Sequence, residues 1–94
     1  MSKSIVSNIR RCFVCETTLS LEKHHIFFNR ANRKLSEKYG CWVYLCAIHH
    51  RDSKQGVHFN REFDQNLKKA CQGMFEKTVG SREEFMEIFG KNWL

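Results

Sequence analysis

The sequence predicts a small α+β domain that a bound zinc ion stabilises, and three observations support this prediction. The chain has 94 residues, which is enough for one domain with a thin core of the kind that metals commonly reinforce. All five histidines and two short cysteine motifs fall within residues 12–58. Apolar residues alternate roughly in this stretch and take helical spacing after it. We therefore expect one domain over 1–94, with a loosely ordered basic segment at 1–11, the zinc site and core at 12–58, and a helical part at 60–94.

The core is expected to contain a strand, a helix and a second strand, in that order. Part of 19–28 alternates between apolar and polar residues, which predicts the first strand. The polar residues 29–39 carry a single apolar stripe with a spacing of four, which predicts a helix that ends at Gly40. The stripe consists of Ala31, Leu35 and Tyr39. Aromatic and β-branched residues at 42–45 predict the second strand. The following residues, Cys46 to about Lys54, predict a short helix that ends before the next glycine.

Two further helices are expected in the C-terminal part. Asn60 is a suitable N-cap for a long helix that Gly80 stops. The apolar face of this helix consists of Phe63, Leu67, Ala70, Cys71, Met74 and Thr78. Residues 81–84, Ser-Arg-Glu-Glu, form a capping box that opens the last helix, and Gly90 ends it. Its inner residues are Phe85, Ile88 and Phe89. We expect residues 93–94, Trp-Leu, to fold back as an apolar plug.

The net charge and the N-terminal residues indicate the cellular compartment in which we expect the protein. Sixteen basic against ten acidic residues give a net charge of +6, and a zinc ion on three thiolates adds two charges and removes three, leaving +5. The first eleven residues lack the apolar segment of a secretory signal, and the longest apolar run, 41–48, is too short to span a bilayer. We expect a cytoplasmic protein without membrane contact, whose cysteines stay reduced and available for metal. The basic surface is compatible with binding to a phosphate backbone.

Two half-sites, each with a two-residue gap, predict a structural zinc ion. They are Cys12-x-x-Cys15 and Cys46-x-x-His49. The gap lets both ligands of a half-site reach one tetrahedral ion, and four protein ligands leave no open position for a substrate. The remaining thiols, Cys41 and Cys71, are expected to be packing residues because free cysteines behave as small apolar side chains.

Two histidine motifs accompany these half-sites. One is His24-His25-Ile26 on the first strand, and the other is Leu45-Cys46-x-x-His49-His50 at the start of the short helix. Together they resemble the ββα-metal (His-Me) finger of the HNH endonuclease family, whose second motif usually reads Cys-x-x-Cys-His. His49 stands at the place of the second cysteine and His50 at that of the final histidine. Residues 56–58, Gly-Val-His, and the ending at 89–94 are similar to small HNH proteins of phages and prophages.

The resemblance implies a divalent-metal-dependent endonuclease that nicks or cuts DNA and leaves 5′-phosphate and 3′-hydroxyl ends. It implies that His24 and His50 bind the catalytic ion and that His25 is the general base, a task that suits an imidazole at neutral pH. His58, eight residues after His50 and past a glycine, is a candidate third ligand. Imidazole ligands without a carboxylate favour Mn²⁺, Ni²⁺, Co²⁺ or Zn²⁺ over Mg²⁺. Because neighbouring strand residues point to opposite faces, His24 and His25 can share a site only at a strand end or bend, or with the metal between the base and the helix.

The resemblance also implies a setting: a phage or prophage protein in the bacterial cytoplasm, with DNA and phage packaging or replication proteins as partners. Two positions depart from the family pattern. The middle asparagine of the motif is expected just before the second strand, where this chain has Cys41, and Asn29 and Asn32 are the candidates to take its place. Some members carry a further histidine four residues after the last one, and here Lys54 occupies that position.

Five basic residues are placed where they can contact DNA phosphates. They are Arg30, Arg33 and Lys34 on the connecting helix, and Arg51 and Lys54 on the short helix. Such contacts position a nucleic acid without reading its sequence. Two other functions fit the same motifs. One is a catalytically inactive, zinc-stabilised module that binds nucleic acid or protein, and the other is a zinc protein with no role on nucleic acid.

Overall fold

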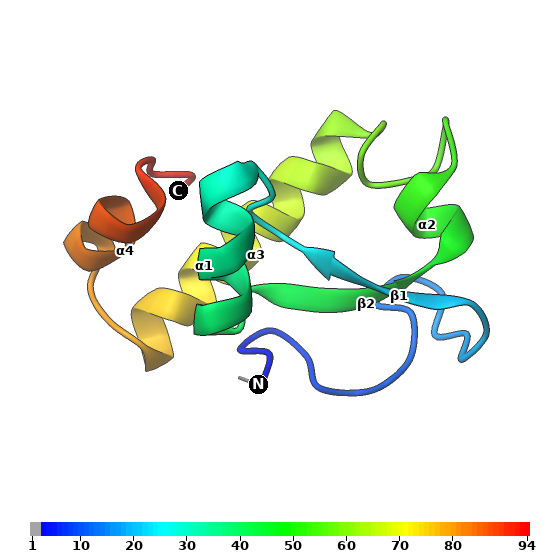
Figure 1. Ribbon diagram of the computed structural model, residues 1–94, viewed down its shortest axis with the longest axis horizontal. Coiled ribbons are helices and arrows are strands. Elements are labelled where there is room, and N and C mark those ends of the chain that lie inside the picture. Colours follow the sequence, from blue (N-terminus) through cyan, green and yellow to red (C-terminus); the bar gives the residue numbers. More distant parts are fainter. Residues whose placement is uncertain (1–2) are drawn as a thin grey trace.

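The computed structural model describes residues 3–94, which form a two-stranded antiparallel sheet and four helices. The elements follow in the order β1 (Leu21–His25), α1 (Arg30–Tyr39), β2 (Trp42–Cys46), α2 (Ala47–Arg51), α3 (Arg61–Thr78) and α4 (Arg82–Phe89). Figure 1 shows the sheet in the middle, with α2 near one end, α1 and α4 toward the other, and α3 running diagonally between them. No helix within residues 3–94 is long and apolar enough to cross a membrane. The predicted α+β class is confirmed.

The helix between the two strands begins and ends at residues that suit its caps. The side chain of Asn29 accepts a hydrogen bond from the backbone N–H of Asn32 at 2.8 Å, as an N-cap does. Gly40 ends α1 in the left-handed region with a φ of 73°, and its N–H bonds the carbonyl of Ser36. A Cβ at Gly40 would also collide with the backbone of Lys3. Glycine is therefore required here for two reasons.

The face of α1 that packs differs in part from the predicted stripe. Leu35 and Tyr39 are half-buried as expected, whereas Ala31 is exposed. Ser36 is fully buried instead. Its hydroxyl accepts a hydrogen bond from the backbone N–H of Phe27 at 3.1 Å and donates to the carbonyl of the same residue at 2.8 Å. This pair of bonds ties α1 to the residues that follow β1.

The pairing of β1 with β2 divides the side chains of β1 between two faces. The five residues of β1 pair antiparallel with the five of β2. Because successive side chains point to opposite faces, Glu22 and His24 lie on the α2 side, where both contact His50. Lys23 and His25 lie on the other side, toward α1. The two neighbouring histidines therefore leave β1 in different directions.

The short helix α2 is shorter than predicted. It covers Ala47–Arg51 rather than extending to Lys54, because the backbone of Asp52 leaves the helical region with a ψ of 139°. The Asp52 carboxylate accepts hydrogen bonds from the backbone N–H groups of Lys54 at 3.0 Å and Gln55 at 2.9 Å, which closes a turn. The chain then returns, so that His58 lies beside α2.

The C-terminal helices begin as predicted. Asn60 accepts a hydrogen bond from the backbone N–H of Phe63 at 3.0 Å. Both bonds of the capping box between Ser81 and Glu84 are present, at 3.0 and 3.1 Å. Gly90 ends α4 with a φ of 81°. The large apolar side chains of the buried core come from both parts of the chain: Ile26, Phe27, Leu45, Leu67, Phe75, Phe85 and Phe89.

Some of the predicted packing in this part is wrong. Ala70 and Thr78 are exposed, because they lie at the edge of the face that α3 buries. Trp93 packs against the core, and its backbone N–H bonds the buried side chain of Gln72 at 2.7 Å. Leu94 is 49% exposed, so only the tryptophan of the predicted plug folds back.

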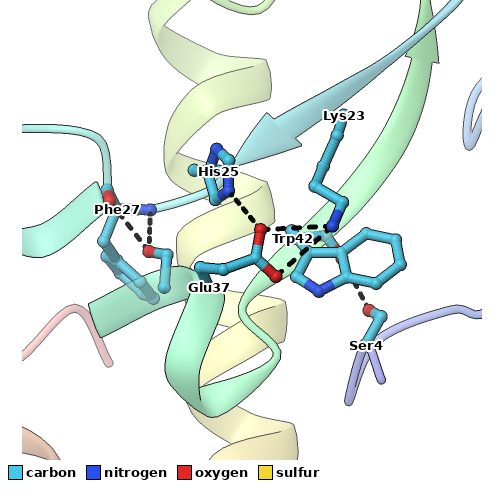
Figure 2. Close-up of polar contacts among 7 residues, drawn as sticks. Ser4, Lys23, His25, Phe27, Glu37 and Trp42 are labelled. Carbon is cyan, nitrogen blue, oxygen red and sulfur yellow. Dashed lines mark hydrogen bonds and ion pairs between the residues drawn. The ribbon is translucent and has the colours of Figure 1, made fainter. Parts of the chain in front are cut away.

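The N-terminal segment makes contacts that its polar composition does not predict. Ser4 is buried, and its hydroxyl donates to the carbonyl of Trp42 at 2.5 Å (Figure 2). The backbone N–H of Ile5 bonds the carbonyl of Gly40 at 2.8 Å. Loose order was predicted for 1–11, of which residues 1–2 lie outside the described part of the chain. Ser4 and Ile5 are therefore bonded to residues at and just before the start of β2, whereas residues 8–11 are exposed.

Candidate metal centres

Three thiols and one imidazole, here named the thiol cluster, converge at the start of α2. Cys12 and Cys15 come from the loop before β1, Cys46 ends β2 and His49 lies in α2. The sulfurs of Cys15 and Cys46 are 3.8 Å apart, and Nδ1 of His49 lies 3.2 Å from the sulfur of Cys46 and 3.7 Å from that of Cys12. On a tetrahedral zinc ion, two sulfurs are about 3.8 Å apart and a sulfur and a nitrogen about 3.5 Å. The thiol cluster can therefore hold a metal ion such as zinc.

Backbone hydrogen bonds shape the loop that carries the first half-site. The N–H of Cys12 bonds the carbonyl of Thr17 at 2.8 Å, and the N–H of Glu16 bonds the carbonyl of Cys12 at 2.9 Å. Glu16 takes the left-handed conformation with a φ of 64°, which tightens this turn. The N–H of Phe13 bonds the carbonyl of Tyr44 in β2 at 2.8 Å. These bonds hold the first half-site against β2.

The environment of Cys12 favours its thiolate, the form that binds metal. Burial raises the pKa of this thiol, but the backbone N–H groups of Cys15, Cys46 and Val14 outweigh burial and lower the pKa to about 6. The backbone near Thr17 lowers the pKa of Cys15, yet desolvation and the two neighbouring thiols raise it above its usual value. Crowded thiolates repel one another, and a divalent cation offsets that repulsion.

A second group, here named the histidine cluster, consists of His24 in β1, His50 in α2 and His58 in the loop before α3. Their ligand nitrogens all lie within 4.8 Å of one another, and the Nε2 atoms of His50 and His58 are 3.2 Å apart. Two imidazole nitrogens on one ion, each about 2.1 Å from it, lie roughly 3.0–3.4 Å apart. His24 is only 1% exposed, and its buried Nε2 has no hydrogen-bond partner within the described residues. Such a nitrogen is costly to bury, and a metal ion in the cluster would satisfy it.

Glu22 orients His50 within the histidine cluster. One carboxylate oxygen lies 2.7 Å from Nδ1 of His50, and the other lies 2.6 Å from a nitrogen of Arg51. The hydrogen bond from His50 and the charge of Arg51 lower the pKa of Glu22, so its carboxylate stays ionised and accepts a hydrogen bond from Nδ1–H of His50. The Nε2 lone pair of His50 is then left for a metal. Burial, with His50 and His58 nearby, lowers the pKa of His24 to about 3. His24 is therefore neutral at neutral pH, as a metal ligand must be.

An open pocket of about 270 Å³ joins the histidine cluster to His25. His25 reaches it because it is the last residue of β1 and the chain bends at the next residue, which meets the condition for neighbouring histidines to share a site. Lys23, Arg33 and Phe28 complete the walls. Phe28 is 41% exposed, and its ring lies 4.9 Å from that of His58. The pocket thus gathers candidate metal ligands, another imidazole and two basic side chains.

The five basic residues proposed to contact DNA have different surroundings. Arg33 lines the pocket, whereas Arg30 and Lys34 are exposed elsewhere on α1. Arg51 is exposed and pairs with a carboxylate of β1 at 2.6 Å. Lys54 is exposed in the turn after α2. Arg33 is therefore the one of the five that the fold brings to the pocket.

The residues considered for the place of the middle asparagine are used elsewhere. Asn29 caps α1, and the side chain of Asn32 donates to the carbonyl of Phe89 at 3.1 Å. Cys41 is buried in the core. The hydrogen bond that the Cys71 thiol donates to Cys41, together with burial, raises the pKa of Cys71 and keeps that thiol neutral. Both cysteines pack in the core, as predicted.

Sequence reasoning missed several residues that surround the histidines. Glu22 lies two positions before His24, so the period of a strand could have placed both on one face. Phe28 carried no signal, because exposed aromatic residues are common in loops. Glu37, which bonds His25 at 3.1 Å, lies on another element, and no local pattern in the sequence connects the two.

Comparison with protein-family models, with curated proteins and with solved structures found no match for this chain. Membership of the HNH family, including the ββα-metal fold, therefore remains a hypothesis that rests on the sequence motifs. The function is argued below from the geometry of the two clusters and the pocket.

Proposed function

We propose that the protein is a divalent-metal-dependent endonuclease of the HNH type that hydrolyses DNA phosphodiester bonds. One observation carries the proposal: a cluster of three histidines opens on the same pocket as His25, apart from the four-ligand thiol cluster. Structural zinc sites are closed by four protein ligands, whereas catalytic sites keep a position open. The thiol cluster suits the first role and the histidine cluster suits the second.

The donor set fits a catalytic divalent ion. When bound to His24, His50 and His58, the ion supplies positive charge that offsets the charge on the phosphate and on the leaving oxygen. Three imidazoles and no carboxylate favour Mn²⁺, Co²⁺, Ni²⁺ or Zn²⁺ over Mg²⁺. We therefore expect weaker support of the reaction by Mg²⁺.

His25 has the role of general base in this proposal. Its imidazole accepts a proton from water, the water oxygen forms a bond to phosphorus, and the bond from phosphorus to O3′ breaks. O3′ takes a proton from solvent, which yields a 3′-hydroxyl and a 5′-phosphate, and His25 returns its proton to solvent. Arg33 lines the same pocket and supplies charge that holds phosphate oxygens in place.

Supercoiled-plasmid cleavage with Mn²⁺, Ni²⁺, Mg²⁺ or a chelator tests the proposal. The wild-type protein is expected to nick or cut with Mn²⁺ or Ni²⁺, more weakly with Mg²⁺, and not at all with the chelator. His25→Ala is expected to lower the rate by about 100-fold or more, because a general base typically contributes that much. Its circular dichroism spectrum is expected to match the wild type, since His25 belongs to neither metal cluster.

Two outcomes of this experiment would point to the alternatives. Failure of the wild type to cut with any metal would contradict the proposal and favour the inactive binding module. Equal cutting by wild type and His25→Ala would point to a contaminant or to a different base. The same assay on a single-stranded RNA of matched length shows whether the protein prefers DNA.

A further inference from the structure

The carboxylate of Glu37, in α1, contacts the imidazole of His25 at the end of β1 (Figure 2). One oxygen of this carboxylate lies 3.1 Å from Nε2 of His25. The Nζ of Lys23 lies 3.2 and 3.3 Å from the two oxygens. Lys23 and His25 are two residues apart on β1 and so share a face. The carboxylate therefore bonds two successive side chains of that face.

We propose that Glu37 is the positioning residue of the general base, an inference that rests on the proposed function. The carboxylate has no proton to donate, so Nε2 of His25 must carry the hydrogen that the two atoms share. The neutral ring is then held in a single tautomer, with its lone pair on Nδ1. Nδ1 is the atom that takes the proton from water. A carboxylate that fixes a catalytic imidazole in this way acts through orientation and tautomer, without touching the substrate.

The surroundings of Glu37 support this assignment. The hydrogen bond from His25 and the contact with Lys23 lower the pKa of Glu37, which keeps it ionised as an acceptor. Lys23 is itself held, with its Nζ 4.2 Å from the ring centre of Trp42 in β2. Ser36, next to Glu37, bonds both backbone groups of Phe27. The turn of α1 that carries Glu37 is therefore locked to the residues that directly follow His25.

The alternative is that Glu37 only ties α1 to the sheet. The two roles differ in what they predict for the ring of His25. If Glu37 only connects α1 to the sheet, its removal lowers the stability of the fold, and the tautomer of His25 does not matter for the reaction. If Glu37 is a positioning residue, it sets the tautomer of His25. Its removal then lowers the turnover number, while the KM for DNA does not change.

Long-range ¹H–¹⁵N correlation spectra of the zinc-loaded protein at about pH 8, where free imidazole is neutral, report the tautomer directly. We expect His25 to be protonated on Nε2 in the wild type and to become a mixture in Glu37→Ala. Glu37→Gln keeps an oxygen acceptor of the same reach and is expected to retain the Nε2–H form. Glu76→Ala is the matched control. Like Glu37, Glu76 is a helical acid with a basic partner, here Arg82 at 3.1 Å, but it lies outside the pocket.

Plasmid cleavage on the same variants completes the test. We expect Glu37→Ala to lower kcat by roughly 10- to 100-fold with KM unchanged, as loss of an orienting partner does at other sites. Glu37→Gln is expected to restore most of the activity, and Glu76→Ala to behave as wild type. An unchanged tautomer or an unchanged kcat in Glu37→Ala would overturn the inference while wild-type cutting stands. Absence of cutting by the wild type would overturn the proposed function itself, so the two failures are distinguishable.

Discussion

The two metal clusters differ in how many ligands they offer and in what lies beside them. The thiol cluster offers four donors at the spacing of a tetrahedral ion, which leaves no position for a substrate. The histidine cluster offers three imidazoles and opens on a pocket that also contains His25 and Arg33. Closed coordination suits a structural ion and open coordination suits chemistry. The geometry of the two clusters thus fits the two different roles that the proposed function gives them.

Both clusters depend on α2, which contains only five residues. His49 contributes to the thiol cluster, and the next residue, His50, contributes to the histidine cluster. Adjacent residues of a helix point about 100° apart, so one turn can serve two sites. A helix this short is not stable alone, and the thiol cluster lies directly at its start. Loss of the thiol cluster is therefore expected to disable the histidine cluster, whereas the reverse is not expected.

The largest effect is expected from Cys12→Ser. Loss of one thiolate from a structural zinc site should cost several kcal/mol, which is a large share of the roughly 5–15 kcal/mol that stabilises a typical domain. Thermal unfolding followed by circular dichroism should show a much lower midpoint, and a chelator should have the same effect on the wild type. A variant that melts like the wild type would break the comparison, because the thiol cluster would then not be structural.

His58→Ala should instead leave the fold intact and weaken metal binding at the histidine cluster. We expect the affinity of the histidine cluster to fall by about 100-fold or more, since even an outer partner is typically worth 10- to 100-fold. Isothermal titration with Mn²⁺ measures this loss. Phe59→Ala is the control, because Phe59 is the next residue and is 63% exposed. Unchanged Mn²⁺ affinity in His58→Ala would remove His58 from the ligand set.

A smaller effect is expected from Glu22→Gln, which weakens the acceptor for the Nδ1 proton of His50. The affinity for Mn²⁺ should fall by about 10-fold, while the thermal midpoint of the zinc-loaded protein stays near that of the wild type. Glu62→Gln, an exposed acid in the first turn of α3, provides the control. If both variants bind Mn²⁺ equally well, the carboxylate does not orient His50.

The smallest effect is expected from Arg33→Ala, which removes one phosphate contact. DNA binding should weaken, and the slope of log affinity against log salt should decrease by about 1. Arg30→Ala removes an exposed arginine of the same helix outside the pocket and should leave the slope unchanged. Equal effects of the two substitutions would show that the charge of α1 matters but not the pocket.

Much of the fold was predictable because it is encoded locally. Gly40 and Asn60 mark helix ends through the bonds of their own backbone or side chain, and those bonds involve residues a few positions away. The thiol cluster was predictable for the same reason, because each half-site spans only four residues. Alternation along β1 predicted that His24 and His25 can share a site at a strand end or bend. His25 is the last residue of β1.

The remaining features depend on how elements lie across one another. Glu37 contacts His25 because α1 packs against the face of β1 that carries Lys23 and His25. The same packing buries Ser36. Neither residue has an apolar pattern that would mark it as buried or functional. The early end of α2 depends on the side chain of Asp52, which competes for the backbone in a way that periodicity does not reveal. Ser4 is held by a bond to Trp42, which is 38 residues away.

The most direct test of the account is a Co²⁺ titration of the wild type and His50→Ala, followed by absorbance and native mass spectrometry. We predict two ions per wild-type chain, one of them with the charge-transfer absorption of thiolate ligands. His50→Ala should keep the thiolate-bound ion and lose the other, with its fold unchanged. A single ion per wild-type chain would contradict the account, as would loss of the thiolate absorption in His50→Ala, because the two clusters would then not be separate sites.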